Sequence, residues 1–275
     1  IRSARGDIPQ HFTRWSGRIF QCWILHGLKR AQRVMCVSEQ TRVELLRVAG
    51  LSSNRVAVVD NALNYPYSPM SEGEALQRLQ RLGLEPAQPF LLHVGGNQWY
   101  KNREGMLRIF NAVRATPGSK DYRLVMVGPP WTAPMRSYVK RAGLQDRVTA
   151  RTNVANEHLR ALYATAEALI FPSLYEGFGW PIIEAQACGC PVFTTGRPPM
   201  TEAGGSAAAY FDPLDERAAA RTIAEGLEDR HKMVEGGIAN AARFSTEAMV
   251  HGYLAAYQAV IAETASQHHS AACPE

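Results

Sequence analysis

Two glutamates that lie eight residues apart, Glu176 and Glu184, have the types and the spacing to bind a sugar. The apolar run at 168–171 predicts a buried strand before them, and Pro181 predicts the first turn of a helix that carries Glu184. The glycine-rich bend between these elements lets backbone approach a ligand, and the helix start offers N–H groups to phosphates. Because paired carboxylates accept hydrogen bonds from vicinal hydroxyl groups, the arrangement suits a ribose at one end and a second sugar at the other. The pattern therefore indicates a nucleotide-sugar site.

Two glutamates with this spacing also occur for reasons unrelated to sugar binding or transfer. A surface glutamate before a helix, followed by an ordinary helical glutamate, is common, so the spacing alone carries little information. The pair also fits the two carboxylates of a glycoside hydrolase. However, Glu184 is flanked by Ala185 and Ala187 on the predicted helix, and that setting suits hydroxyl recognition better than protonation of a glycoside.

A second candidate for phosphate binding follows the predicted strand at 90–94. The loop Gly95-Gly96-Asn97 is either a tight turn or a place where backbone passes close beneath phosphates. Lys101 follows six residues after Gly95 and would add a positive charge, although a solvated lysine at a helix start explains it as well. The chain has no G-x-G-x-x-G fingerprint after a strand, which disfavours an NAD-linked oxidoreductase.

The composition is that of an ordinary soluble globular protein, with 275 residues, 46% hydrophobic and 20% charged, and a net charge of +5. No nucleic-acid-binding motif accompanies the positive charge, so phosphate-bearing ligands and an anionic membrane face are the expected partners, and nucleic acid is not. The five cysteines are odd in number and have neither disulfide nor zinc spacing, which favours a reducing cytoplasm.

Strands and helices alternate along most of the chain. Short apolar runs predict strands, and stripes such as Met106, Ile109, Phe110 and Val113 predict the helices between them. The Asn- and Pro-rich segment 60–69 predicts a domain linker. Alternation of this kind indicates an α/β protein with a parallel sheet covered on both faces. The predicted strands are 34–37, 56–59, 90–94, 123–127, 148–150, 168–171 and 192–194, and the predicted closing helices are 217–227 and 248–261.

The segment around the glutamates, FPSLYEGFGWPIIEAQACGCPV, resembles the signature of the retaining glycosyltransferases of family 4, which have the GT-B fold. RVMCVSEQTRVELLRVAGLSSNRVAVVDNAL is similar to the end of that family's N-terminal domain. FLLHVGGNQWYKNREGMLRIFNAV resembles the first strand, glycine loop and helix of its C-terminal domain, and TEAGGSAAAYFDPLD resembles a late loop and strand of that domain. The similarity runs from about residue 30 to about residue 260.

The resemblance implies a GT-B architecture with one complete Rossmann-like, parallel-sheet domain for the donor and a remnant of the N-terminal Rossmann-like domain. We expect residues 1–65 to form the acceptor-side remnant and crossover, 66–265 the nucleotide-sugar-binding domain, and 266–275 a flexible tail. The part of the N-terminal domain without a match carries the family's acceptor site and a histidine near the catalytic centre. The sequence leaves open whether this chain is a fragment, one of two chains, or an incomplete enzyme.

The resemblance also implies roles for individual residues. Glu176 and Lys101 are the expected catalytic residues: Glu176 would contact the transferred sugar and Lys101 would neutralise the donor diphosphate. Glu184 would hold the ribose hydroxyls. The family's arginine after the first glycine is absent here, because that position is Gly96, so Lys101, backbone N–H groups and another cation such as Arg103 or Arg197 would stabilise the leaving diphosphate. The remaining expected donor-binding residues are Gly95, Gly96, Asn97, Asn153, Val154, Gly177, Phe178, Gly179 and Trp180.

The function implied by the resemblance is transfer of a hexose, with retention, from a UDP- or GDP-linked donor to a hydroxyl of a glycan or lipid-linked acceptor. We expect the reaction to need no metal and no cofactor and to belong to polysaccharide, lipopolysaccharide or glycoconjugate biosynthesis. A second hypothesis, favoured by Gly96 and the unmatched N-terminal portion, is a non-catalytic nucleotide-sugar-binding module that needs a partner chain. A GT-B sugar epimerase is a third, disfavoured by the GFGWP sequence.

The segment 14–33 is basic and amphipathic, with aromatic and aliphatic side chains on one face. It fits an interfacial helix at an anionic membrane, which would place the protein peripherally at the inner membrane face. It also fits a domain helix whose apolar face packs on N-terminal strands, and we favour this interpretation. The expected location is therefore cytoplasmic, with peripheral membrane association as the alternative.

Overall fold

The computed structural model describes residues 15–85, 88–116 and 121–271. Contacts between Cα atoms divide the chain into two compact units. Ala62–Ser245 form the larger unit, and Ile1–Asn61 together with Thr246–Glu275 form the smaller one. The two units are therefore described separately.

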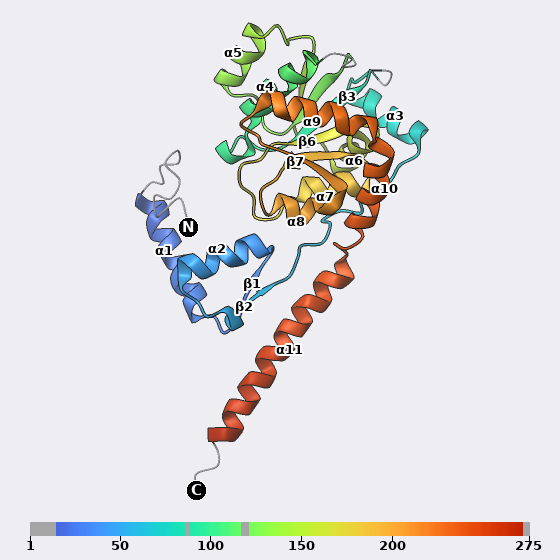
Figure 1. The fold of residues 1–275 in the computed structure, drawn as a ribbon. Helices are drawn as coiled ribbons and strands as arrows, with labels where there is room; N and C mark the ends of the chain where they lie inside the picture. Colours follow the sequence, from blue (N-terminus) through green and yellow to red (C-terminus); the bar gives the residue numbers. More distant parts are fainter. Residues whose placement is uncertain (1–14, 86–87, 117–120, 272–275) are drawn as a thin grey trace. The chain divides into compact units, whose positions relative to one another are not determined.

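The larger unit is built on a six-stranded sheet in the order β5-β4-β3-β6-β7-β8 (Figure 1). Every neighbouring pair of strands is parallel, as in β3 and β4, where Leu91 lies opposite Leu124. This confirms the predicted α/β class with a parallel sheet. Because all six strands run the same way, the loops that follow them gather at one edge. The strands are β3 (Phe90–Val94), β4 (Arg123–Val127), β5 (Val148–Arg151), β6 (Ala168–Phe171), β7 (Val192–Thr195) and β8 (Ala208–Phe211).

Helices cover both faces of this sheet (Figure 1). On one face, α4 (Arg103–Arg114), α5 (Ala133–Arg141) and α9 (Glu216–Glu228) bury their apolar side chains in one core with the strands. The predicted stripe on α4 lies in this core, and all four of its residues are at most 2% exposed. The opposite layer contains α3 (Glu72–Arg81), α6 (Asn156–Thr165), α7 (Trp180–Ala187) and α10 (Arg230–Ala241), which pack on one another. The short helix α8 (Met200–Gly204) follows β7 and contacts α7.

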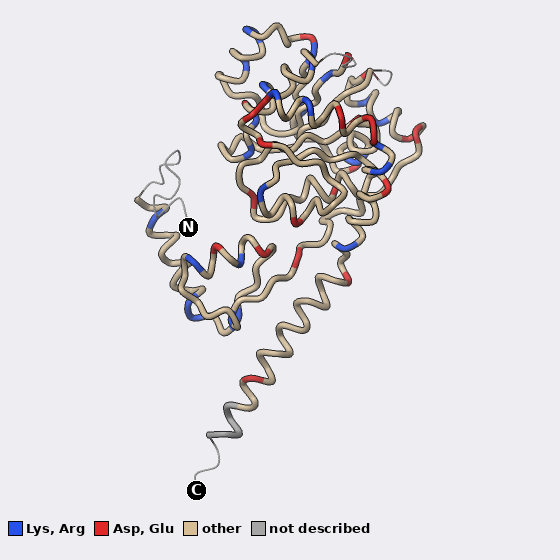
Figure 2. Tube along the Cα trace, in the orientation of Figure 1, with Lys and Arg blue, Asp and Glu red and all other residues tan. Residues whose placement is uncertain are grey.

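The smaller unit has two parallel strands, β1 (Val34–Cys36) and β2 (Val56–Val58), with α2 (Glu39–Ala49) between them. Ser38 caps α2 by accepting a hydrogen bond from the Thr41 N–H, as its position before an apolar stripe predicts. Two further helices complete the unit, α1 (Trp15–Arg30) and α11 (Thr246–Ala271). Figure 2 shows few Lys, Arg, Asp or Glu residues along the part of α11 that it colours.

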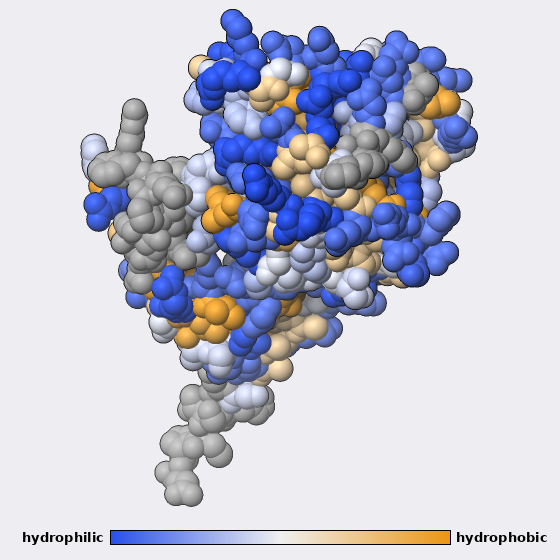
Figure 3. Space-filling model, turned by 45° about the horizontal axis from the view of Figure 1, so that its top comes forward, coloured by the Kyte–Doolittle hydropathy of each residue, from blue (hydrophilic) through white to orange (hydrophobic). Residues whose placement is uncertain are grey.

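Most of the exposed large hydrophobic side chains belong to the smaller unit. On α1, Trp15 and Trp23 are 76% and 78% exposed, whereas Leu25 and Leu28 pack on the unit's own core. On α11, Leu254 and Ile261 are exposed in the same way. By contrast, the surface of the larger unit that Figure 3 shows is mainly hydrophilic. The helix predicted within 14–33 is confirmed, Arg14 lies outside the described residues, and both interpretations of its apolar face stay predictions.

Element boundaries follow the sequence closely in the larger unit, where β3, β4 and β6 have the predicted ends. The sequence did not predict α3, α8 or α10. The predicted tail 266–275 overlaps α11, which continues to Ala271, and Cys273 lies outside the described residues. The structural units also differ from the predicted division, since α11 groups with residues 1–61 and not with the larger unit. The assignment of acceptor-side and donor-side domains stays a prediction.

Candidate functional site

The two residues expected to be catalytic contact each other at the carboxyl edge of the sheet. Lys101 ends a short 3-10 turn after β3, and Glu176 lies in the loop after β6, the next strand in the sheet. The Nζ atom of Lys101 is 2.7 Å from Oε1 of Glu176, and the two side chains are 18% and 9% exposed. The ammonium also lies 5.4 Å from the centre of the Phe171 ring. A charge pair that is this shielded from water interacts strongly with a phosphate or a sugar hydroxyl placed beside it.

Asn102 helps to hold the two loops that carry this pair together. It has φ 51°, a left-handed conformation that Asn tolerates better than most residues, and its Nδ2 donates to Pro172 O at 3.1 Å. Leu174 N also donates to Tyr100 O at 2.7 Å. These bonds tie the loop after β3 to the loop after β6, so that Lys101 and Glu176 are fixed relative to each other.

Glu184 lies on α7 and is buried, with 5% of its surface exposed. Its Oε2 accepts a hydrogen bond of 2.9 Å from the hydroxyl of Tyr163 on α6. Burial raises the pKa of Glu184 from 4.5 to about 7, although the Tyr163 hydrogen bond and the Lys101 charge both act to lower that pKa. Near neutral pH, ligands that donate hydrogen bonds therefore favour the ionised form of this carboxyl.

Tyr163 and Tyr67 form an aromatic wall beside Glu184 that sequence reasoning missed. Tyr163 is fully buried, and the Tyr67 ring packs edge-on against it with 5.8 Å between the ring centres. Burial raises the pKa of both phenols, so both remain protonated and able to donate a hydrogen bond. No local spacing links these tyrosines to Glu184, because they come from the segment before α3 and from a different helix.

The first turn of α7 is built from the GFGWP sequence. Gly179 precedes the helix with φ 110°, a conformation that a residue with a side chain adopts only under strain. Phe178 is buried and packs edge-on against Phe244, with 5.5 Å between the ring centres. The Trp180 indole N–H donates to Ala62 O at 3.0 Å, while 40% of this residue stays exposed. Pro181 lies in the first turn, as predicted. The aromatic contacts therefore fix the start of a helix whose N–H groups and dipole attract anions.

The loop Gly95-Gly96-Asn97 lies directly against the loop after β4. A Cβ atom on Gly128, which has φ 149°, would be 2.1 Å from Gly95 O, so only glycine permits this contact. Asn97 Nδ2 donates to Pro130 O at 2.9 Å. Below the loop, His93 is fully buried and its Nδ1 lies 3.1 Å from Ile170 O. Burial lowers the pKa of His93 to about 3, so the buried imidazole is neutral.

Residues 77–244 match the family model described as glycosyl transferases group 1. This match covers more than half of the chain, including Lys101, Glu176 and Glu184. The chain belongs to the group 1 glycosyl transferases.

Individual relatives and a solved structure are also similar to the chain. The chain is 29% identical over 87% of its length to the O-antigen chain mannosyltransferase B of Escherichia coli. It is 31% identical over 95% of its length to the D-inositol 3-phosphate glycosyltransferase of Segniliparus rotundus. It spans 64% and 58% of the lengths of these relatives. The crystal structure of Anabaena Alr3699/HepE with UDP-glucose superposes with a TM-score of 0.72 at 20% identity, covering 94% of this chain and 70% of that one. The structural likeness confirms the GT-B fold class.

The remaining predicted donor-binding residues are Asn153, Val154 and Gly177, and they lie in loops at the same edge of the sheet. Asn153 and Val154 follow β5, which lies two strands from β3, and Asn153 has φ 53°. Nearby, Arg151 at the end of β5 donates through Nε to Leu82 O at 2.8 Å, which ties this strand to the end of α3. The position of Asn153 and Val154 suits the far end of an extended ligand. Gly177 stands between Glu176 and Phe178 on the loop after β6, and its role stays a prediction.

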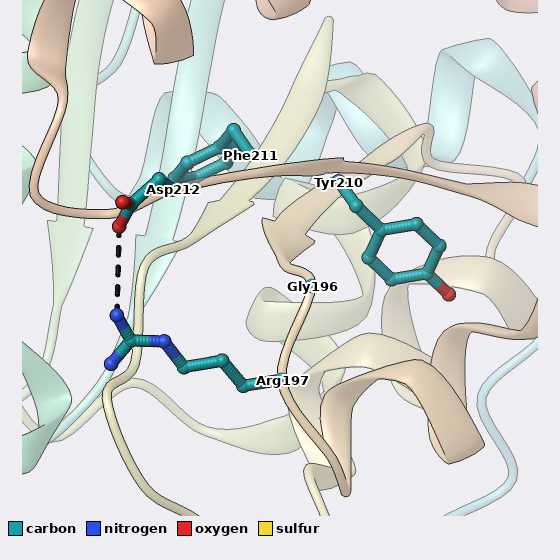
Figure 4. A pocket seen from close by; sticks show the side chains of 5 residues that line it. All are labelled: Gly196, Arg197, Tyr210, Phe211 and Asp212. Atoms are coloured by element: carbon teal, nitrogen blue, oxygen red, sulfur yellow. Dashed lines mark ion pairs between the residues drawn. The ribbon is translucent and has the colours of Figure 1, made fainter.

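A separate pocket of about 300 Å³ opens where β7 and β8 end (Figure 4). Its lining includes Gly196, Arg197, Tyr210, Phe211 and Asp212. Figure 4 shows the Arg197 side chain directed toward Asp212, and its Nη2 is 3.5 Å from the Asp212 Oδ1 atom. Arg197 is thus paired with a carboxylate beside β8, the outermost strand on one side of the sheet. It is separated from the loop that follows β3.

Within the part of the chain that the structure describes, no three His, Cys, Asp or Glu side chains are grouped in a way that could hold a metal ion. None of the helices in the described ranges is both long enough and apolar enough to cross a membrane.

Proposed function

We propose that this chain forms the donor-binding part of a retaining glycosyltransferase that moves a hexose from a nucleoside diphosphate sugar to a hydroxyl group. The observation that carries the proposal is the meeting of the Lys101–Glu176 pair, the buried Glu184 and the start of α7 at one edge of the sheet. Open α/β sheets bind nucleotides at this edge. Membership in the group 1 glycosyl transferases supports the same assignment.

Each group has a distinct part in the proposed reaction. Glu184 accepts hydrogen bonds from the ribose hydroxyls, and Glu176 contacts the transferred sugar. Lys101 and the N–H groups at the start of α7 bind the diphosphate. The bond between the sugar C1 and the β-phosphate oxygen breaks, and a bond from C1 to the acceptor oxygen forms on the same face. The acceptor proton passes to the departing phosphate. Negative charge grows on that phosphate in the transition state, so fixed positive groups there accelerate the step.

The relatives narrow the biological setting of the proposal. One is an O-antigen chain mannosyltransferase and another is a D-inositol 3-phosphate glycosyltransferase, so we propose a glycan or lipid-linked acceptor in polysaccharide, lipopolysaccharide or glycoconjugate biosynthesis. The reaction needs no metal ion in this proposal, and adding EDTA should leave its rate unchanged. A cytoplasmic location is part of the same proposal, and peripheral attachment to a membrane through α1 is its alternative.

A second candidate function is a nucleotide-sugar-binding subunit that acts only with a partner chain. Gly96 favours it, because the loop after β3 carries no arginine of its own. Both candidates predict nucleotide binding, and only the first predicts transfer by this protein. The product's anomeric configuration, followed by NMR, would test retention once a donor is known.

Titration with UDP, GDP and ADP, followed by thermal unfolding, tests the donor site. A nucleotide at a hundred times its dissociation constant stabilises a folded protein by about 2.7 kcal/mol. We expect one nucleotide to raise the unfolding temperature and the shift to disappear in Lys101→Ala and Glu184→Ala. The exposed Lys232 forms a surface ion pair with Asp229, so Lys232→Ala is a matched control that should keep the shift. If none of the three nucleotides changes the unfolding temperature, the proposal is wrong for this chain.

A further inference from the structure

Arg103, the first residue of α4, is a buried cation with incomplete hydrogen bonding. Only 4% of its surface is exposed. Its Nη1 donates to Pro129 O at 2.9 Å and to the Oδ1 of Asn97. Its Nε and Nη2 atoms are buried and have no hydrogen-bond partner. Among the ion pairs formed by the residues that the structure describes, none involves Arg103.

A buried guanidinium without a counter-ion is energetically costly. Burial lowers the pKa of Arg103, but an arginine keeps its charge in proteins. Removing an unpaired charge from water has a large free-energy cost, and neutral carbonyl oxygens recover only part of it. An anion that binds nearby would offset the remaining cost. The position of Arg103 therefore indicates where such an anion binds.

Arg103 lies beneath the meeting point of two loops. Asn97 belongs to the loop after β3 and Pro129 to the loop after β4, and Gly128 and Gly95 make the close contact between them. Lys101 is on the same segment as Asn97. A Cβ atom on Gly128 would lie 3.7 Å from Cζ of Arg103, and one on Gly95 would lie 3.6 Å from Cβ of Lys101, so both cationic side chains pack against this contact.

We propose that Arg103 is the second cation of the diphosphate site and acts together with Lys101. Because its free N–H groups are buried, it acts as a positioning residue. It holds Asn97 and the Pro129 carbonyl in place and adds its positive charge from beneath the loop. The other candidate, Arg197, is paired with Asp212 in the pocket between β7 and β8. This inference rests on the proposed donor site.

Removing the positive charge at position 103 and adding one at position 96 on the loop tests the inference. The variants are Arg103→Gln, Gly96→Arg and the double variant. The three atoms nearest to a Cβ at Gly96 all belong to the end of the exposed Gln98 side chain, the nearest at 2.2 Å, so the substitution is feasible once that side chain moves aside. Calorimetry would measure affinity for the nucleoside diphosphate found by titration (UDP, GDP or ADP) and for the same nucleoside without phosphates.

We expect Arg103→Gln to weaken nucleoside diphosphate binding by about 10- to 100-fold, the effect of removing one positive charge that is shielded from water and lies near the phosphates. Nucleoside binding should change by no more than about threefold, since the charge acts on phosphates. In the double variant, Gly96→Arg should raise the affinity for the nucleoside diphosphate at least about tenfold above that of Arg103→Gln alone. Arg108→Gln is the matched control, because Arg108 is on the same helix but forms an exposed pair with Glu216. It should leave both affinities unchanged.

Three results would overturn the inference. Equal weakening of nucleoside and nucleoside diphosphate binding by Arg103→Gln would assign Arg103 a structural role only. Failure of Gly96→Arg to rescue a folded Arg103→Gln variant would show that its charge is not used. If wild-type protein binds no nucleoside diphosphate, the proposed function itself fails. Should Arg103→Gln not fold, Arg103→Lys replaces it: because lysine keeps the positive charge, it should retain nucleoside diphosphate affinity to within about threefold, and a selective loss would contradict the inference.

Discussion

Replacing Glu184 with glutamine tests whether the buried carboxyl destabilises the free protein. Burial raises its pKa from 4.5 to about 7, and one pKa unit corresponds to about 1.4 kcal/mol. Keeping this group ionised in the folded state therefore costs about 3 kcal/mol relative to the unfolded chain. The folded state binds the proton more tightly between pH 4.5 and pH 7, so this contribution to stability is lost as the pH rises toward 7.

Glu184→Gln should consequently be more stable than wild type at pH 8, by up to about 3 kcal/mol, and within about 1 kcal/mol of it at pH 5. The glutamine carbonyl can still accept the hydrogen bond from Tyr163. Urea unfolding at pH 5, 6, 7 and 8 measures the difference, and Glu228→Gln on the exposed part of α9 is the control that removes a carboxylate without burial. A difference between wild type and Glu184→Gln that stays constant across this range would refute the reasoning.

The same carboxyl should make ligand binding depend on pH. With a pKa of about 7, Glu184 is about one-tenth ionised at pH 6 and about nine-tenths ionised at pH 8 in the free protein. If the ionised form holds the ribose hydroxyls, nucleoside affinity should be about tenfold higher at pH 8 than at pH 6. A nucleoside without phosphates avoids titration of the ligand. Glu184→Gln should bind more weakly and show no such pH dependence.

Three further predictions concern the contacts around the site. Tyr163→Phe removes the hydrogen bond to Glu184, so urea unfolding should show a loss of about 1–3 kcal/mol at pH 8 and a smaller loss at pH 5. Glu176→Gln removes a negative charge beside Lys101, so calorimetry should show tighter nucleoside diphosphate binding while sugar transfer slows; weaker binding would contradict this. Gly128→Ala should destabilise the protein by at least about 2 kcal/mol in urea, whereas Gly143→Ala, with φ 63° and open space around it, should cost about 1 kcal/mol.

In the larger unit, the helix α4 and strands such as β3, β4 and β6 were predictable because their apolar patterns are strong and local. The α4 stripe and the apolar strands β3, β4 and β6 bury their side chains in one core, so burial and sequence period agree. The helix α10 escaped prediction because it carries two adjacent glycines, Gly236 and Gly237, and a weak apolar stripe. Gly237 lets α10 approach Gln186 on α7, where a Cβ would lie 3.2 Å from Cγ of that side chain. Its place depends on a partner helix about fifty residues earlier, which no local pattern encodes.

The candidate site divides in the same way. Lys101 and Glu176 were predicted separately, and the parallel order of β3 and β6 brings them to 2.7 Å. Tyr163 could not be predicted as the partner of Glu184, because that contact depends on how α6 packs beside α7. Motifs therefore identify candidate ligand-binding residues. The side chains that fix those residues, such as Tyr163, come from neighbouring elements that have no fixed sequence spacing from the motif.

Gly96 shows why a single missing residue is weak evidence against function. The family resemblance implies an arginine where the loop after β3 has Gly96, so this loop carries one positive charge fewer than the resemblance implies. In three dimensions, the loop and the first turn of α4 converge, so that Arg103, seven residues further along the chain, reaches Asn97 from below. An electrostatic field depends on where a charge lies and how well it is shielded from water, not on which residue carries it. A buried cation beneath the loop can therefore compensate for an exposed one on it, and the Gly96→Arg rescue of Arg103→Gln is the experiment that separates this exchange from a true loss of the donor site.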